Sequence, residues 1–160
     1  RRASRAGARY SRVGRGGGGT FLAPVGGVTG GPRATLGVVH VRTGPDPESL
    51  SAATSGMGHE HPQVKRGDSV GGHRVESAWL RGRVDPAAML ESGTEGPAEL
   101  PTDDTDPPEL VVCPAFNDRS GGTWINVEGR GFLAPFLPAA IPNAECYLLD
   151  GTRLGPFRAV

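Results

Sequence analysis

Glycine and proline make up about a quarter of the chain, with 26 glycines and 15 prolines among 160 residues, and this content restricts the fold more than any other feature. Glycine loses more backbone entropy on folding than other residues, and proline cannot donate a backbone hydrogen bond to a helix or sheet. The length suffices for one domain, but such an aperiodic content is typical of loop-rich or disordered chains. We therefore predict a mostly irregular, low-complexity chain with regular structure in short stretches.

Apolar residues are concentrated near the carboxyl end. Roughly half of the residues in 110–160 are apolar, whereas fewer than a third of those in 1–109 are. Asp150-Gly151 separates two short apolar runs, and this dipeptide favours a type I′ hairpin that pairs 146–149 with 152–155. Three prolines within 132–142 are expected to keep that stretch irregular. These patterns predict a small β-rich module at 109–160.

Two short helices are predicted where an Asp-Pro pair begins a stretch that ends at glycine. The stretches are 46–56 and 85–93. In each, the aspartate can cap the helix and proline suits the first helical position, while the closing glycine suits the end. A helix of two turns is marginal unless it packs against the rest of the fold.

The remaining chain divides by composition into three further regions. Residues 1–33 form a Gly/Arg-rich basic arm that we expect to be disordered, since it has little apolar surface to bury. Residues 34–91 are predicted to be a weakly ordered middle segment, with a strand candidate at 34–41. Residues 92–108 contain four prolines and five acidic residues, which is typical of an extended linker.

The net charge of zero conceals a strong gradient along the chain. Residues 1–50 carry eight arginines against two acidic residues, whereas 51–110 carry five basic and eleven acidic residues. Arginine binds phosphate through two parallel hydrogen bonds and stacks on bases. The candidate nucleic-acid-binding residues are Arg1, Arg2, Arg5, Arg9, Arg12 and Arg15. An alternative is that the arm is a solvated tail or the remnant of a transit segment.

Three histidines lie close together in the sequence, at His59, His61 and His73. On a strand, a His-x-His pair points both imidazoles to one face, where a third histidine from the next strand can complete a metal site. The stretch "GHEHP" resembles the opening of the first cupin motif, although Lys65 stands where that motif has a glutamate. The resemblance implies a small metal-dependent β-barrel enzyme with a divalent metal ion as cofactor.

Cys113 and Cys146 are the two cysteines, and their wide spacing is not that of a zinc or redox motif. They can close one disulfide in an oxidising compartment or remain reduced in a core, and the spacing does not decide between these states. The sequence contains no apolar run of about 18 residues, so we predict no transmembrane helix.

The leading hypothesis is a non-enzymatic interaction protein whose arm contacts nucleic acid or another polyanion, as in a peripheral subunit of a ribonucleoprotein, with no cofactor. A protein partner is expected if the chain is folded. The first alternative is the cupin-like metal enzyme. The second is the product of a reading frame without selected function, although agreement between local signals, such as the hairpin and the helix starts, argues against it.

Overall fold

The protein is described from a computed structural model, in which the described residues are 20–24, 35–40, 54–85, 88 and 107–160. These residues form a nine-stranded sheet with a short helix beside it. The strands are β1 (Thr20–Pro24), β2 (Thr35–His40), β3 (Thr54–Gly58), β4 (Pro62–Gly67), β5 (His73–Arg83), β6 (Glu109–Val112), β7 (Thr123–Trp124), β8 (Glu145–Leu148) and β9 (Arg153–Pro156). A β-rich fold in the carboxyl-terminal part of the chain is thereby confirmed.

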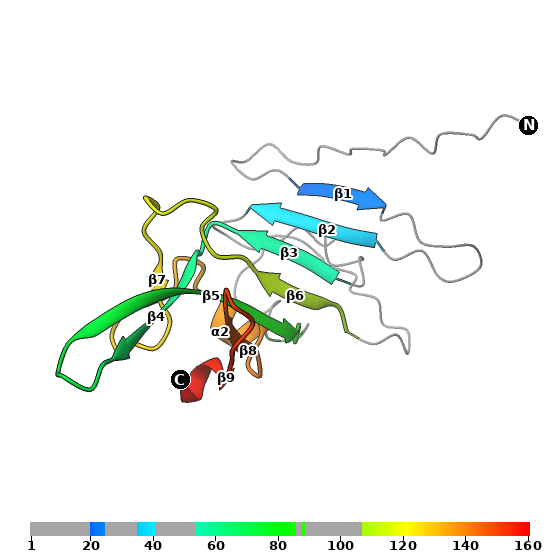
Figure 1. Ribbon diagram of the computed structural model, residues 1–160. Coiled ribbons are helices and arrows are strands. Elements are labelled where there is room, and N and C mark those ends of the chain that lie inside the picture. The colour runs from blue at the N-terminus through cyan, green and yellow to red at the C-terminus, as the bar shows by residue number, and fades with distance from the viewer. Residues whose placement is uncertain (1–19, 25–34, 41–53, 86–87, 89–106) are drawn as a thin grey trace, which may run out of the picture.

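Strand β5 organises the sheet because it pairs with three other strands along its length. Its first half pairs with β4 and its second half with β6 and β8, all antiparallel. The path continues from β6 through β3 and β2 to β1, with the β6–β3 and β3–β2 pairs parallel. Figure 1 shows β5 as a long curved ribbon that runs from the β4–β5 hairpin to the strands around β6.

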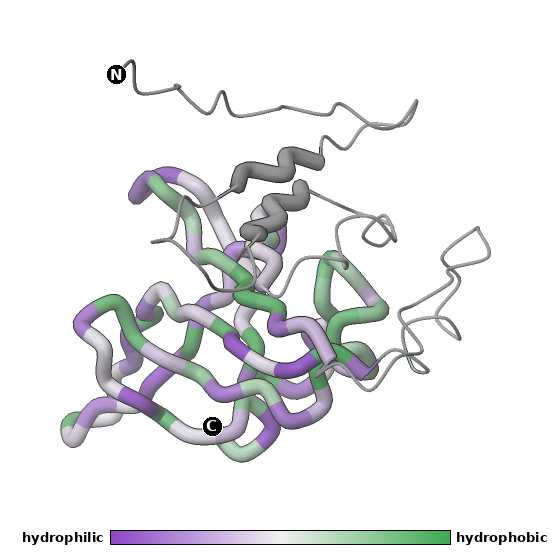
Figure 2. Tube along the Cα trace, turned by 90° about the vertical axis from the view of Figure 1, so that its right-hand side faces the viewer, coloured by the Kyte–Doolittle hydropathy of each residue, from purple (hydrophilic) through white to green (hydrophobic). Residues whose placement is uncertain are grey.

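Burial alternates along the strands, so that one face of the sheet excludes water. In β3, β6 and β8 every second residue is buried, as the two-residue period of a strand requires. Hydrophilic and hydrophobic segments alternate along the tube in Figure 2. The buried hydrophobic residues are Met57, Val64, Ala78, Leu80, Val84, Leu110, Val112, Ala134, Phe136, Leu137, Ala140, Ile141, Ala144, Cys146, Leu148 and Phe157.

The core extends beyond the residues of the predicted module at 109–160. Strands β3, β4 and β5 contribute fully buried side chains to the same cluster, among them Met57, Val64 and Leu80. Apolar residues are sparse in this middle region, but burial alternates along β3, in the first half of β4 and around Ala78 and Leu80 of β5, so the few apolar side chains at the buried positions face the core. A low average apolar content thus understates how much of the middle region packs into the core.

The two helices predicted at Asp-Pro pairs have different outcomes. Of the stretch 46–56, residues 54–56 belong to β3, and the rest lies outside the described residues. In the stretch 85–93, the Asp85 carboxylate accepts a hydrogen bond of 3.1 Å from the Ala88 N–H, as an N-cap does, and Ala88 is helical. The rest of that stretch, 86–87 and 89–93, lies outside the described residues.

The α-helix that the structure describes in full is α2 (Leu137–Ala140), and a 3₁₀ turn, η2, follows β9 at Phe157–Ala159. Helix α2 lies in the stretch 132–142, which we expected to be irregular because of its prolines. Pro138 is in the first turn of the helix, where its missing N–H has no intrahelical partner to lose. None of the helical segments among the described residues has the length and apolar content to cross a membrane.

The predicted hairpin is confirmed, although its turn type is different. Strands β8 and β9 pair antiparallel around Asp150-Gly151. The Gly151 N–H donates to the Leu148 carbonyl at 3.0 Å, and the Leu148 N–H donates to the Thr152 carbonyl at 2.9 Å. Only Gly151 in this turn has a positive φ, of 89°. The loop therefore has three residues with glycine at the left-handed position, rather than the two left-handed residues of a type I′ turn.

Candidate functional site

A groove of about 480 Å³ crosses the face of the sheet opposite to the core. Its volume lies within the range of ligand-binding pockets. The groove is lined by Thr54, Trp79, Arg81, Glu109, Val111, Tyr147, Leu148, Leu149 and Gly151. These residues come from β3, β6, β5 and β8 and from the β8–β9 turn, so the groove exists only once the four strands have paired.

Two aromatic side chains form the floor of the groove. Trp79 and Tyr147 are register partners in the antiparallel β5–β8 pair. On β5, Trp79 alternates with the core residues Ala78 and Leu80, so its ring stands on the outer face. Register partners of this kind have Cβ atoms about 5 Å apart, so the two side chains leave the sheet at neighbouring positions. Both residues are half-buried, which leaves part of each ring open to the groove.

Arginine–glutamate pairs stand beside this aromatic floor. The Arg81 guanidinium donates two hydrogen bonds to Glu109, at 2.7 and 2.8 Å, and Arg153 donates two to Glu145, at 2.9 and 2.8 Å. These glutamates raise the pKa of the two arginines, with a smaller contribution from Tyr147 to each. The bidentate geometry holds each guanidinium in one place beside the rings. Of the two pairs, Arg81–Glu109 lines the groove, which therefore combines apolar aromatic surface with a fixed polar edge.

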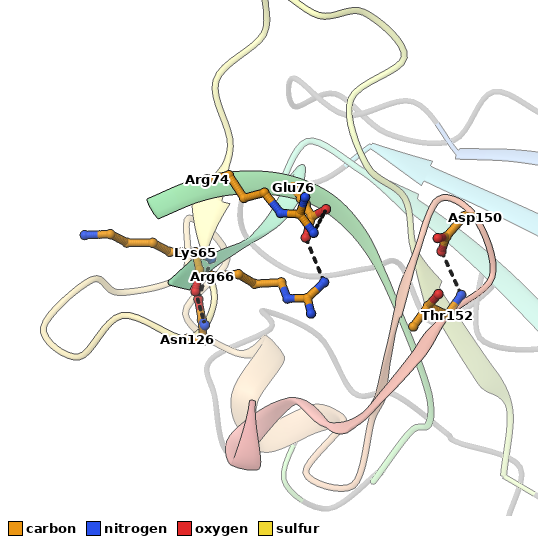
Figure 3. Close-up of polar contacts among 7 residues, drawn as sticks. All are labelled: Lys65, Arg66, Arg74, Glu76, Asn126, Asp150 and Thr152. Carbon is orange, nitrogen blue, oxygen red and sulfur yellow. Dashed lines mark hydrogen bonds and ion pairs between the residues drawn. The ribbon is translucent and has the colours of Figure 1, made fainter. Parts of the chain in front are cut away.

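A second network joins β4, β5 and the loop after β7. Glu76 on β5 pairs with Arg66 at 3.0 Å and with Arg74 at 3.2 Å, as Figure 3 shows. The Asn126 side chain exchanges two hydrogen bonds of 2.9 Å with the backbone of Lys65, also drawn in Figure 3. These contacts fasten the loop after β7 to the β4–β5 hairpin.

The β3–β4 turn contains a fully buried carboxylate. Glu60 has no exposed surface, and its two oxygens accept hydrogen bonds from the backbone N–H groups of Leu133 at 2.9 Å and Ala134 at 2.8 Å. Its neighbours His59 and His61 both have a positive φ, of 80° and 49°. A buried carboxylate needs such donors because desolvation penalises its charge. Sequence patterns do not identify this role, since the two donors lie 73 and 74 residues further along the chain.

The three predicted metal ligands are not brought together. His59 and His61 lie in the left-handed turn rather than on an extended strand, and the His61 Nδ1 atom is 3.2 Å from the Gly121 carbonyl oxygen. His73 begins β5, where it pairs with Gly67 at the far end of the β4–β5 hairpin. Within the described ranges, no three His, Cys, Asp or Glu side chains are grouped in a way that could hold a metal ion.

The two cysteines are free thiols, and the sheet keeps them apart. Leu80 on β5 pairs with Cys146 in β8 and with Val112, the residue before Cys113. Two strand spacings therefore separate them, about 10 Å, which exceeds the Cα separation that a disulfide allows. Burial raises the pKa of both thiols, that of Cys146 to about 11. Both groups are consequently protonated and weakly nucleophilic at neutral pH.

The six arginines predicted to bind nucleic acid all lie in residues 1–15, outside the described residues. The groove was not predicted from the sequence. Trp79 lies in the segment 34–91 that the sequence predicts to be weakly ordered, whereas Tyr147 lies in the predicted hairpin strand 146–149, so nothing in the sequence links the two residues. No known protein family, curated protein or solved structure matches this chain.

Proposed function

We propose that the protein is a non-enzymatic interaction protein that binds a polyanion through the arginines of residues 1–15. Single-stranded nucleic acid is the polyanion that best suits the molecule, because the folded part also offers an aromatic groove. The arm supplies attraction to phosphate, which is independent of sequence, and the sheet supplies a surface for a ligand that carries flat rings.

The observation that supports this proposal is how charge is distributed between the arm and the folded part. The described residues carry nine basic and nine acidic side chains, with histidine counted as neutral. Four arginines among them are engaged by glutamates, namely Arg66, Arg74, Arg81 and Arg153. Residues 1–15, in contrast, contain six arginines and no acidic residue. The excess positive charge is thus concentrated in the arm, whereas the described part is balanced.

The dependence of binding on salt tests the proposal. For the full chain with a fluorescent oligo-dT strand, six phosphate contacts predict a log–log slope of about −4 for the binding constant against salt concentration. Replacing all six arginines of residues 1–15 by glutamine should abolish that slope. Replacing the same six by lysine is the matched control, because lysine retains the charge, and it should keep most of the slope.

Two results would contradict the proposal. The first is that the full chain does not bind oligo-dT at low salt. The second is that the glutamine variant binds with the same affinity and the same salt dependence as the unmodified chain, which would exclude the arm as the contact.

A further inference from the structure

We infer that the groove containing Trp79 and Tyr147 is a stacking site for the bases of a single strand of nucleic acid. The inference rests on the proposed function, in which the arm holds the phosphates of that strand. The groove would be a second contact, separate from the arm and located on the folded part, and the bases of the strand would fill it.

The shape of the groove suits a row of stacked rings. It crosses β3, β6, β5 and β8, and three inter-strand steps give a length of about 14 Å across the sheet. Its floor is the cross-strand pair Trp79 and Tyr147, and Val111 and Leu149 add apolar surface. Aromatic side chains on a sheet bind bases of any sequence, since every base has a flat face.

The chemistry at the edge of the groove also suits a nucleic acid. Arg81 is fixed by Glu109 and retains its charge, and its side chain is 58% exposed despite the pair. A guanidinium in this position can stack on a base or approach a phosphate. The described part has equal numbers of basic and acidic residues, so its net charge does not repel a strand that the arm attracts.

The other tryptophan is engaged differently. The ring of Trp124 has Arg130 at 4.1 Å and Lys65 at 5.6 Å from its centroid, and these cations cover it within the protein. Among the described residues, the cation–π contacts involve Trp124 and Phe157 and not the aromatic floor of the groove. Trp79 and Trp124 therefore provide a test site and an internal reference in one chain.

Tryptophan fluorescence of the full chain tests stacking directly. In a Trp124→Phe variant the emission reports Trp79, and in a Trp79→Phe variant it reports Trp124. We expect oligo-dT to quench the emission of Trp79, while an abasic strand of the same length leaves it unchanged. Neither strand should alter the emission of Trp124. The inference would be overturned if both strands quenched the Trp79 emission equally, or if saturating oligo-dT did not quench it at all.

Affinity measurements provide a second readout. Tyr147→Thr keeps a residue that favours strands and removes the ring, and it should weaken oligo-dT binding by about 5-fold to 150-fold. Tyr147→Phe should retain the affinity. Phe116→Ala is the matched control, because Phe116 is 93% exposed and lies outside the groove. Circular dichroism checks that each variant is folded, and the fluorescence experiment requires no change of Tyr147.

The outcomes separate this inference from the proposed function. If oligo-dT binds with the slope due to the arm but Tyr147→Thr binds equally well and Trp79 is not quenched, the stacking site is refuted and the arm contact stands. If Trp79 is quenched by a proline-rich peptide and not by oligo-dT, the groove is a peptide site and the inference is refuted. If oligo-dT does not bind at all, the proposed function fails as well.

Discussion

The β3–β4 turn and the β8–β9 turn both require left-handed backbone, but they achieve it by different means. In the β8–β9 turn, Gly151 adopts the positive φ, and both closing hydrogen bonds join residues within 148–152. In the β3–β4 turn, His59 and His61 adopt it, although a side chain disfavours this region. The β8–β9 turn is exposed, whereas the β3–β4 turn contains the fully buried Glu60.

The difference shows how distant contacts can replace local preference. The β3–β4 turn is held by Leu133 and Ala134, which bind the Glu60 carboxylate, and by Thr123, whose N–H lies 3.2 Å from the His61 carbonyl oxygen. Such contacts offset the cost of the left-handed histidines, which is on the order of 1–3 kcal/mol for each residue. The β8–β9 turn needs no such support because glycine carries no side chain.

The largest expected effect is at Glu60. Glu60→Ala leaves the backbone N–H groups of Leu133 and of the buried Ala134 without their acceptor, and we expect the free energy of unfolding to fall by about 3 kcal/mol. Glu128→Ala removes an exposed carboxylate and serves as the control, with a change within about 0.5 kcal/mol. Urea denaturation measures both. Equal stability of the two variants would mean that the distant contacts do not hold this turn.

A smaller effect is expected at Gly122, which packs against the β3–β4 turn. A Cβ atom at this position would clash with the His61 carbonyl oxygen and would lie 3.0 Å from Gln63 side-chain carbons. Gly122→Ala should therefore cost about 2 kcal/mol. Gly121→Ala is the matched control, since a Cβ there has nothing within 4 Å. If the Gly122→Ala and Gly121→Ala variants have the same thermal unfolding midpoint, the backbone at Gly122 leaves room for a Cβ atom beside the His61 carbonyl oxygen, and the prediction is wrong.

The local turn should be less sensitive. Gly151 has open space around its Cβ position, so Gly151→Ala is penalised only by its φ of 89°. We expect a loss of about 1 kcal/mol in the free energy of unfolding, measured by urea denaturation. The free energy of unfolding should fall less in Gly151→Asn than in Gly151→Ala, because asparagine tolerates left-handed backbone better than alanine does. A loss as large as that of Glu60→Ala would erase the contrast between the turns.

The smallest effect concerns pH. The Thr152 N–H donates to the Asp150 carboxylate at 2.9 Å, as drawn in Figure 3, and this hydrogen bond lowers the pKa of Asp150. A lowered pKa in the folded state stabilises the protein above the usual aspartate pKa, and that contribution is lost as the pH falls through the lowered value. Asp150→Asn should reduce the difference in stability between neutral and acidic pH. If the stability of the Asp150→Asn variant depends on pH in the same way as that of the unmodified chain, the hydrogen bond between Thr152 and Asp150 makes no contribution.

Several local features could be predicted from the sequence. The strand at 35–40 and those flanking Asp150-Gly151 were recognised because β-branched and apolar runs end at turn-forming residues. The contribution of β3 to β5 to the core was missed, because each of these strands has few apolar residues and only strand pairing brings Met57, Val64 and Leu80 into one buried cluster. Helix α2 was missed because proline was interpreted as a breaker and not as a first-turn residue.

The sequence by itself determined the partition of charge, with basic residues in 1–15 and a balanced folded part, and it determined the hairpin at Asp150-Gly151. Both depend on residues that are close together in the chain. The tertiary structure alone decided that Trp79 and Tyr147 share a groove and that Glu60 meets Leu133 and Ala134. These arrangements join segments that are far apart in the chain, and only the register of the folded sheet specifies which of their residues become neighbours.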